Sequence, residues 1–211
     1  MSKTVLITGG TRGIGRACAE AFLAADYAVT IVARSSAALT EMATQLGVFT
    51  IAADLSKETG VAAVPIRPYD VVVLNAAAFA PGTLLDAESD TFTELLPLNV
   101  LANHHLARRL LPEMIAQNDG HLIVIGSTGT DNWKGHMTAY VANKYALRGL
   151  FYGWQQELAL SQVRCTLVAP GATLTSSWDN EEVPEGILMP EEVAGVVLGV
   201  VEKGEEGRVC L

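Results

Sequence analysis

Basic side chains are scarce in this sequence. Its 211 residues include 14 Lys and Arg against 23 Asp and Glu, which gives a formal net charge of −9 at pH 7. Proteins that bind nucleic acid or anionic membranes through charge need a basic surface. We therefore expect no nucleic-acid partner and no membrane partner. An anionic ligand would need local positive charge, which single arginines can supply.

Cysteine and histidine are also sparse. The three cysteines (Cys18, Cys165 and Cys210) are odd in number and form no Cys-x-x-Cys pair. This pattern favours a reducing compartment, and we expect a cytoplasmic protein. Cys18 and Cys165 lie inside apolar runs and are predicted core residues. The four histidines are not clustered at metal-ligand spacing, so no metal site is predicted.

Long apolar runs are missing too. The stretch Val193–Val201 is too short to span a bilayer, and the N-terminal apolar stretch stops at Gly9, which argues against a signal peptide. No repeat, linker or low-complexity segment divides the chain. With 50% apolar residues the sequence can bury a large core, and we predict one domain over residues 1–211.

The first positive signal is a glycine motif near the N-terminus. An apolar strand over residues 3–8 leads into Gly9-Gly10-Thr11-Arg12-Gly13-Ile14-Gly15, and an amphipathic helix follows. Glycines after a strand allow a tight turn and close approach to the backbone, and the helix N-terminus attracts an anion. We assign Gly9 to the turn, Gly13 to close approach of a pyrophosphate and Gly15 to helix–strand packing. The alternative is a glycine-rich turn without a ligand.

Strands and helices alternate along the rest of the chain. The strands are mostly β-branched without polar alternation, which predicts a parallel sheet covered on both faces, in a doubly wound Rossmann α/β fold of about seven strands. Expected strands lie at 3–8, 28–32, 48–52, 70–74, 122–125, 163–168 and 208–211. Expected helices lie at 14–25, 36–46, 88–117 (interrupted by Pro97 and Pro112, with a kink near Asn99), 137–160 and from Pro190 onward.

The end of the second strand predicts the cofactor. An acidic residue there would bind the adenosine ribose, but the sequence is Ala33-Arg34-Ser35-Ser36. The guanidinium of Arg34 suits a 2′-phosphate, and Arg12 could reach the same group. We therefore expect NADP(H) in preference to NAD(H). Two solvated surface arginines are the alternative interpretation.

Two further strand ends carry candidate cofactor residues. Asp54, followed by Leu55, could bind the adenine amino group, or Asp54 could merely cap the next segment. The fourth strand opens into Asn75-Ala76-Ala77-Ala78, whose small side chains permit close ligand approach.

A candidate catalytic group follows the fifth strand. Tyr140 and Lys144 are four residues apart on a predicted helix, so they share one face. An adjacent ammonium would lower the pKa of the phenol and make it a general acid/base, and the hydroxyl of Ser127 could hold a substrate oxygen beside it. Asn99 lies in an apolar pattern and is either a structural hydrogen-bonding residue or part of the site. The alternative is that each residue has a separate structural role. Ser127 could be a strand-end cap, Tyr140 a surface residue and Lys144 a solvated charge.

Taken in order, these motifs resemble the short-chain dehydrogenase/reductase family: the glycine loop, Asn75-Ala76, Asn99, Ser127, Tyr140-Val-Ala-Asn-Lys144 and Pro170-Gly171 through Thr175. The resemblance implies NAD(P)-dependent carbonyl/alcohol oxidoreduction. It implies that Tyr140 protonates the carbonyl oxygen, that Ser127 orients it, and that Lys144 lowers the tyrosine pKa and binds the nicotinamide ribose. It further implies that Asn99 holds a relay water. The backbone over Pro170–Thr173 would position the nicotinamide carboxamide, and Thr175 would touch the cofactor.

The sequence departs from the family pattern in two places. Ala77 replaces a glycine of the family's Asn-Asn-Ala-Gly, and the segment between Thr175 and Pro190 is short, which predicts a reduced lid and a more open pocket. Candidate apolar wall residues are Phe79, Trp133, Met137 and Trp178, with core or dimer contacts as the alternative. The resemblance also implies a homodimer or homotetramer paired through the helices at 98–117 and 137–160.

The predicted function is hydride transfer between NADP(H) and a small carbonyl or alcohol substrate. A non-catalytic NADP(H)-binding sensor of the same fold is the rival hypothesis. A serine hydrolase is disfavoured because Ser127 lies in Gly-Ser-Thr-Gly rather than in a G-x-S-x-G turn.

Overall fold

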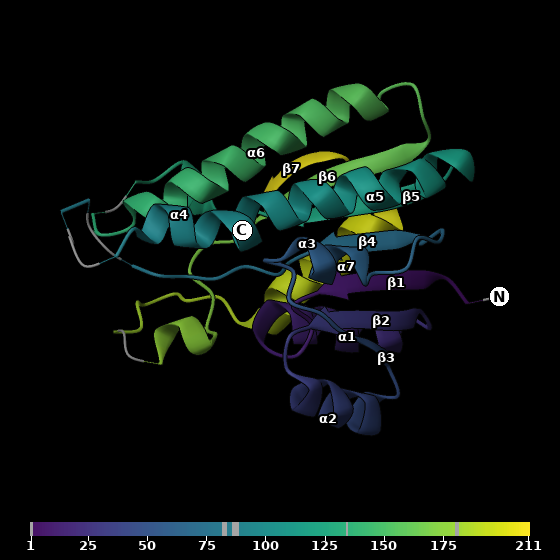
Figure 1. The fold of residues 1–211 in the computed structure, drawn as a ribbon, viewed down its shortest axis with the longest axis horizontal. Helices are drawn as coiled ribbons and strands as arrows, with labels where there is room; N and C mark the ends of the chain where they lie inside the picture. Colours follow the sequence, from purple (N-terminus) through teal and green to yellow (C-terminus); the bar gives the residue numbers. More distant parts are fainter. Residues whose placement is uncertain (1, 82–83, 86–88, 134, 180–181) are drawn as a thin grey trace.

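A computed structural model describes residues 2–81, 84–85, 89–133, 135–179 and 182–211. It is a three-layer α/β domain in which helices cover both faces of a seven-stranded sheet (Figure 1). All neighbouring strands pair in parallel, in the order β3-β2-β1-β4-β5-β6-β7. The strands are β1 (Thr4–Thr8), β2 (Ala28–Ala33), β3 (Phe49–Ala52), β4 (Val71–Leu74), β5 (Gly120–Ile125), β6 (Val163–Ala169) and β7 (Gly207–Cys210).

In the described part of the chain, seven α-helices alternate with these strands, together with three short helical segments. The α-helices are α1 (Gly13–Ala24), α2 (Ser36–Leu46), α3 (Glu58–Ala62), α4 (Thr91–Leu96), α5 (Ala102–Ala116), α6 (Thr138–Leu158) and α7 (Pro190–Lys203). The others are a π-helix, η1 (Pro97–Leu101), and two 3₁₀ turns, η2 (Thr128–Thr130) and η3 (Ser176–Trp178).

The pleat of the central strands explains the three layers. All residues of β4 and β5 are buried, because alternate side chains enter two separate cores. In β4, Val72 and Leu74 pack with α5 and α6, whereas Val71 and Val73 pack with α1, α2 and α7. Continuous β-branched runs are therefore the expected sequence for these strands.

The predicted alternation of strands and helices is confirmed, and the structure shows where α2 and α7 begin. Ser35 is the N-cap of α2, and its hydroxyl accepts a hydrogen bond from the Ala38 amide at 3.3 Å. Pro190 is the first residue of α7, as expected from its fixed φ. Cys18 and Cys165 are buried, and burial raises the pKa of both thiols to about 12.

The expected helix over 88–117 needed correction. Residue 88 lies outside the described residues, and α4 begins only at Thr91, because the carboxylate of Asp90 caps it by accepting from the Thr93 amide at 3.2 Å. The π-helical turn η1 then surrounds Asn99, at the position predicted for a kink. The helix continues past Pro112 to the end of α5, so this proline does not interrupt it.

The strand order has its switch point between β1 and β4. Successive strands run outward in opposite directions from β1 and β4, so the chain diverges between the carboxyl ends of these two strands. In open α/β sheets this switch point is where ligands bind. Among the described residues, no helix is both long and apolar enough to cross a bilayer.

Candidate active site

The ends of β1 and β4 are fastened together by side chains. The Thr8 hydroxyl accepts hydrogen bonds from the amides of Asn75 and Ala76, both at 2.9 Å. In return, the Asn75 side-chain amide donates to the carbonyl oxygens of Thr8 (2.9 Å) and Gly9 (3.3 Å). The start of the glycine loop is therefore held rigidly against Asn75.

The glycines of this loop have distinct geometric roles. Gly9 and Gly13 have positive φ values of 69° and 53°, which glycine adopts without strain. A Cβ added to Gly15 would lie 2.3 Å from the Gly9 carbonyl oxygen, so α1 can pack against the loop only with glycine there. The predicted turn at Gly9 and the packing role of Gly15 fit these contacts. A Cβ at Gly13 would lie 3.0 Å from Thr175 Cγ2, which brings Thr175 beside the loop.

The N-terminus of α1 is suited to an anion. Its N-cap is Arg12, which is exposed and makes no side-chain capping bond, and no acidic residue lies in the first turn. Among the described helices, α2 and α4 carry Ser35 and Asp90 as caps, whereas α3, α5 and α6 also lack a capping side chain. Backbone amides without an acidic cap, together with the helix dipole, fit a pyrophosphate. Thr11 and Ile14 complete the turn, both half-buried.

Arg34 and Asp54 lie at the adjacent ends of β2 and β3. Arg34 is exposed, and the two strands pair up to Ala33 and Ala52. The Ser56 hydroxyl, and more weakly the charges of Lys57 and Arg34, lower the pKa of Asp54. Because Asp54 Oδ1 accepts from both the amide and the hydroxyl of Ser56, its capping role is realised in this structure. Leu55 beside it is buried in the core.

The three residues predicted to be catalytic meet at the carboxyl end of β5. Lys144 is buried, and its Nζ donates to the carbonyl oxygen of Ile125, the last residue of β5, at 2.9 Å. The same Nζ lies 5.8 Å from the centre of the Tyr140 ring. Ser127 is two residues beyond the strand, and its Oγ accepts from the Gly129 amide at 3.0 Å.

The protonation state of Tyr140 differs from the sequence-based expectation. Burial raises its pKa to about 12, and a hydrogen bond with Ser127 opposes this rise. The predicted net lowering of this pKa is therefore wrong. The physical reason is that desolvation of the phenolate outweighs the lowering of the pKa by the hydrogen bond with Ser127. Burial also lowers the pKa of Lys144 to about 8.

Asn99 is fully engaged with the backbone. Its Oδ1 accepts from the Ala78 amide at 2.8 Å, and its Nδ2 donates to the Ala78 carbonyl at 2.9 Å. It is buried in the π-helical turn, and its own carbonyl accepts from Asn103 Nδ2 at 2.9 Å. These contacts support the structural alternative, in which Asn99 fixes the segment after β4, while its part in a proton relay stays a prediction.

The segment after β6 is tied to both sides of the site. The Pro170 carbonyl accepts from the Thr128 amide at 3.0 Å, and the Gly171 amide donates to the Leu211 carbonyl at 3.1 Å. Thr173 is buried and its hydroxyl donates to the Gly171 carbonyl at 3.1 Å. The loop carrying Pro170, Gly171, Thr173 and Thr175 thus lies between the Ser127 loop and Gly13.

The four predicted wall residues lie in different surroundings. The Phe79 ring meets the Tyr140 ring edge-on at 5.0 Å, which places it at the site. Trp133, which is 54% exposed, instead stacks on Tyr145 at 5.5 Å. The indole of Trp178 donates to the Thr173 carbonyl at 2.9 Å. Met137 is the half-buried residue that precedes α6.

Sequence reasoning missed the contacts made by Thr8 and by Asp131, and it left the effect of Ala77 open. Thr8 bridges β1 and β4, and a polar residue at the end of an apolar strand could have signalled this. Ala77, where a glycine was expected, is exposed, so its methyl group causes no clash within the described chain. Asp131, which pairs with Arg148 and Arg208, had no sequence signal, because its partners lie far along the chain.

The family follows from comparison with known proteins. The family model described as short chain dehydrogenase matches residues 3–185. The chain belongs to the short-chain dehydrogenase family. This short-chain dehydrogenase is 31% identical to the uncharacterized oxidoreductase YmfI of Bacillus subtilis, over 92% of this chain and 89% of that protein. It is 30% identical to carbonyl reductase family member 4 of Xenopus laevis, over 96% of this chain and 92% of that protein.

A solved structure agrees with this assignment. An alcohol dehydrogenase from the archaeon Thermococcus sibiricus, determined with 5-hydroxy-NADP, superposes with a TM-score of 0.85 at 27% sequence identity. The match covers 100% of this chain and 96% of the archaeal chain. The short-chain dehydrogenase described here is therefore an oxidoreductase with a Rossmann-like NAD(P)-binding fold.

Proposed function

We propose that this short-chain dehydrogenase is an NADP(H)-dependent reductase of small carbonyl compounds, with Tyr140 as the proton donor. The observation that carries the proposal is the convergence of Tyr140, Ser127 and Lys144 at the end of β5. There the raised pKa keeps the phenol protonated at neutral pH, so it can donate a proton to a carbonyl oxygen.

Each side chain has a separate task in this proposal. Tyr140 donates its hydroxyl proton to the carbonyl oxygen as negative charge develops there. Ser127 uses its Oγ to accept from the Gly129 amide, which leaves its proton available for the same oxygen. The Lys144 ammonium, held by the Ile125 carbonyl, stabilises the phenolate that remains. When bound, NADPH supplies the hydride.

The proposed cofactor site uses the glycine loop and the strand ends. The uncapped first turn of α1 would bind the pyrophosphate, and Arg34 with Arg12 would bind the 2′-phosphate. Asn75, Ala76 and Ala77 would line the cofactor at the switch point, and the loop from Pro170 to Thr175 would hold the nicotinamide end. The NADP-derived ligand of the archaeal alcohol dehydrogenase supports this cofactor class.

Arg34→Asp tests the cofactor preference. A carboxylate at this position would repel the 2′-phosphate and accept hydrogen bonds from a free ribose. We expect the ratio of the Kd values for NADH and NADPH to fall by about tenfold or more, as loss of a charge-assisted hydrogen bond predicts. Protein fluorescence titrations with both cofactors measure the ratio without a substrate.

The control for this substitution is Arg16→Gln. Arg16 lies on α1, and its guanidinium donates to the side chains of Glu20 (2.9 Å) and Gln45 (3.3 Å). Arg16→Gln should leave the ratio of the Kd values for NADH and NADPH unchanged. An unchanged ratio in Arg34→Asp as well would argue against binding of the 2′-phosphate by Arg34.

The decisive test of function is oxidation of NADPH, followed by its absorbance, with a panel of aldehydes, ketones and quinones. Turnover of any member supports the reductase. Tight NADPH binding without oxidation across the panel would favour the non-catalytic binding protein instead. Pairing of subunits through α5 and α6 and a cytoplasmic location stay predictions.

A further inference from the structure

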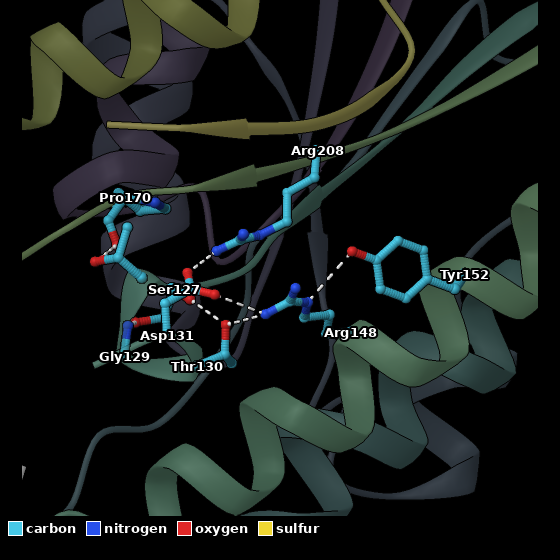
Figure 2. Close-up of polar contacts among 9 residues, drawn as sticks. Ser127, Gly129, Thr130, Asp131, Arg148, Tyr152, Pro170 and Arg208 are labelled. Carbon is cyan, nitrogen blue, oxygen red and sulfur yellow. Dashed lines mark hydrogen bonds and ion pairs between the residues drawn. The ribbon is translucent and has the colours of Figure 1, made fainter. Parts of the chain in front are cut away.

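An ion-pair cluster lies behind the Ser127 loop. Asp131 follows η2, and it is held between Arg148 of α6 and Arg208 of β7 (Figure 2). Arg148 Nη1 donates to Asp131 Oδ1 at 2.9 Å, and Arg208 donates to Asp131 Oδ2. We call Asp131, Arg148 and Arg208 the Asp131 cluster. It joins three elements that are distant in the sequence.

The cluster is connected to Ser127 through a short chain of hydrogen bonds. Arg148 Nη1 also donates to the Thr130 hydroxyl at 3.1 Å, and that hydroxyl donates to the Ser127 carbonyl at 3.0 Å. Thr130 is buried. The Asp131 amide itself donates to the Thr128 carbonyl at 2.9 Å. The turn that carries Ser127 is thus held by the Thr130 hydroxyl, which bonds the Ser127 carbonyl, and by the Asp131 amide, which bonds the Thr128 carbonyl.

Two partly exposed guanidinium groups share this carboxylate. The side chains of Arg148 and Arg208 are 21% and 17% exposed, whereas Asp131 is 38% exposed. Arg208 Nε is buried and has no hydrogen-bond partner among the described residues. Hydrogen bonding from Arg208 and Arg148 lowers the pKa of Asp131. Without the carboxylate, two guanidinium groups would face each other across the same space.

We propose that Asp131 is a positioning residue, which holds the turn from Ser127 to Thr130 so that the Ser127 hydroxyl stays beside Tyr140. The effect on turnover rests on the proposed reductase function. The effect on the turn itself does not. Asp131 touches neither Tyr140 nor Lys144 in the described contacts, so its influence must pass through Thr130 and the backbone of Ser127.

Asp131→Asn tests this role because it keeps the size of the side chain and removes its charge. Hydrogen–deuterium exchange of peptides over residues 127–131 should rise at least fivefold in this variant. The matched control is Asp119→Asn. Asp119 pairs with Arg164 at 3.1 Å at the opposite end of β5, so its loss should leave exchange at 127–131 unchanged. Equal exchange in wild type and Asp131→Asn would overturn the inference, whatever the activity.

Turnover provides the second measurement. With any carbonyl that the wild type reduces, we expect Asp131→Asn to lower kcat about tenfold and to change the Kd of NADPH less than twofold. In a Ser127→Ala background the same substitution should have almost no further effect on kcat, because the group that it positions is gone.

The outcomes separate this inference from the proposed function. A tenfold loss in both backgrounds would assign the effect to general destabilisation and overturn the positioning role. Wild-type protein that reduces no carbonyl of the panel would refute the reductase, while the exchange experiment would still decide whether Asp131 fixes the turn.

Discussion

Phenylalanine at position 140 is expected to abolish turnover while NADPH binding persists. The substitution removes only the hydroxyl and keeps the ring that meets Phe79 edge-on at 5.0 Å. The proton that we assign to the carbonyl oxygen then has no donor. General acid catalysis contributes about 10²–10⁴-fold to rate, so kcat/KM should fall by about a thousandfold. Stopped-flow or steady-state absorbance of NADPH measures the rate, and fluorescence titration measures the Kd.

The control for Tyr140→Phe is the same substitution at Tyr145, which lies further along α6. Tyr145 is 42% exposed and stacks on Trp133, away from Lys144. Tyr145→Phe removes the equivalent phenolic hydroxyl from the same helix, and the variant should keep full activity. If Tyr140→Phe retained more than a tenth of the wild-type kcat/KM, Tyr140 would not be the proton donor.

Gly15→Ala should damage both the fold and the cofactor site. The added Cβ would lie 2.3 Å from the Gly9 carbonyl oxygen and 2.6 Å from Asn75 Nδ2. The first of these atoms is backbone, so the methyl group fits only if the loop moves away from α1. Overpacking of this kind costs about 1–3 kcal/mol in the free energy of unfolding. We expect the loop movement to weaken NADPH binding at least tenfold.

Urea unfolding and NADPH titration measure the two effects of Gly15→Ala. The control is Gly195→Ala in α7, where an added Cβ meets no atom within 4 Å. Alanine there should raise stability by up to about 1 kcal/mol, because alanine favours helix over glycine. Wild-type stability and wild-type NADPH affinity in Gly15→Ala would show that the loop tolerates a side chain and that our packing argument is wrong.

The pKa of the Tyr140 phenol depends on burial that the sequence does not reveal. The spacing of Tyr140 and Lys144 correctly predicts one helix and a shared region of space. It does not predict which of two opposing effects controls the pKa of the phenol. Desolvation depends on how completely the surrounding elements cover the ring, and those elements come from distant parts of the chain. The raised pKa of about 12 was therefore accessible only from the tertiary structure.

The tryptophans and Asn99 make the same point about side-chain partners. Trp133, Trp178 and Phe79 were grouped because they are large and apolar near the site. The structure gives Trp133 a stacking partner on α6, gives Trp178 a backbone acceptor and places the Phe79 ring edge-on against Tyr140. For Asn99 the structure shows that Ala78 bonds both ends of its amide, while its part in a proton relay stays a prediction.

The sequence by itself determined the alternation of strands and helices, the glycine turn at Gly9–Gly15 and the set of motifs at the carboxyl ends of the strands. These features are local, since they depend on periodicity, on backbone freedom at glycine and on capping residues. Only the tertiary structure decided the pairing of Asp131 with Arg208, the bridge made by Thr8 and the burial of Lys144. Each of these joins residues that are far apart in the chain, and only the packing of the elements brings their atoms within reach.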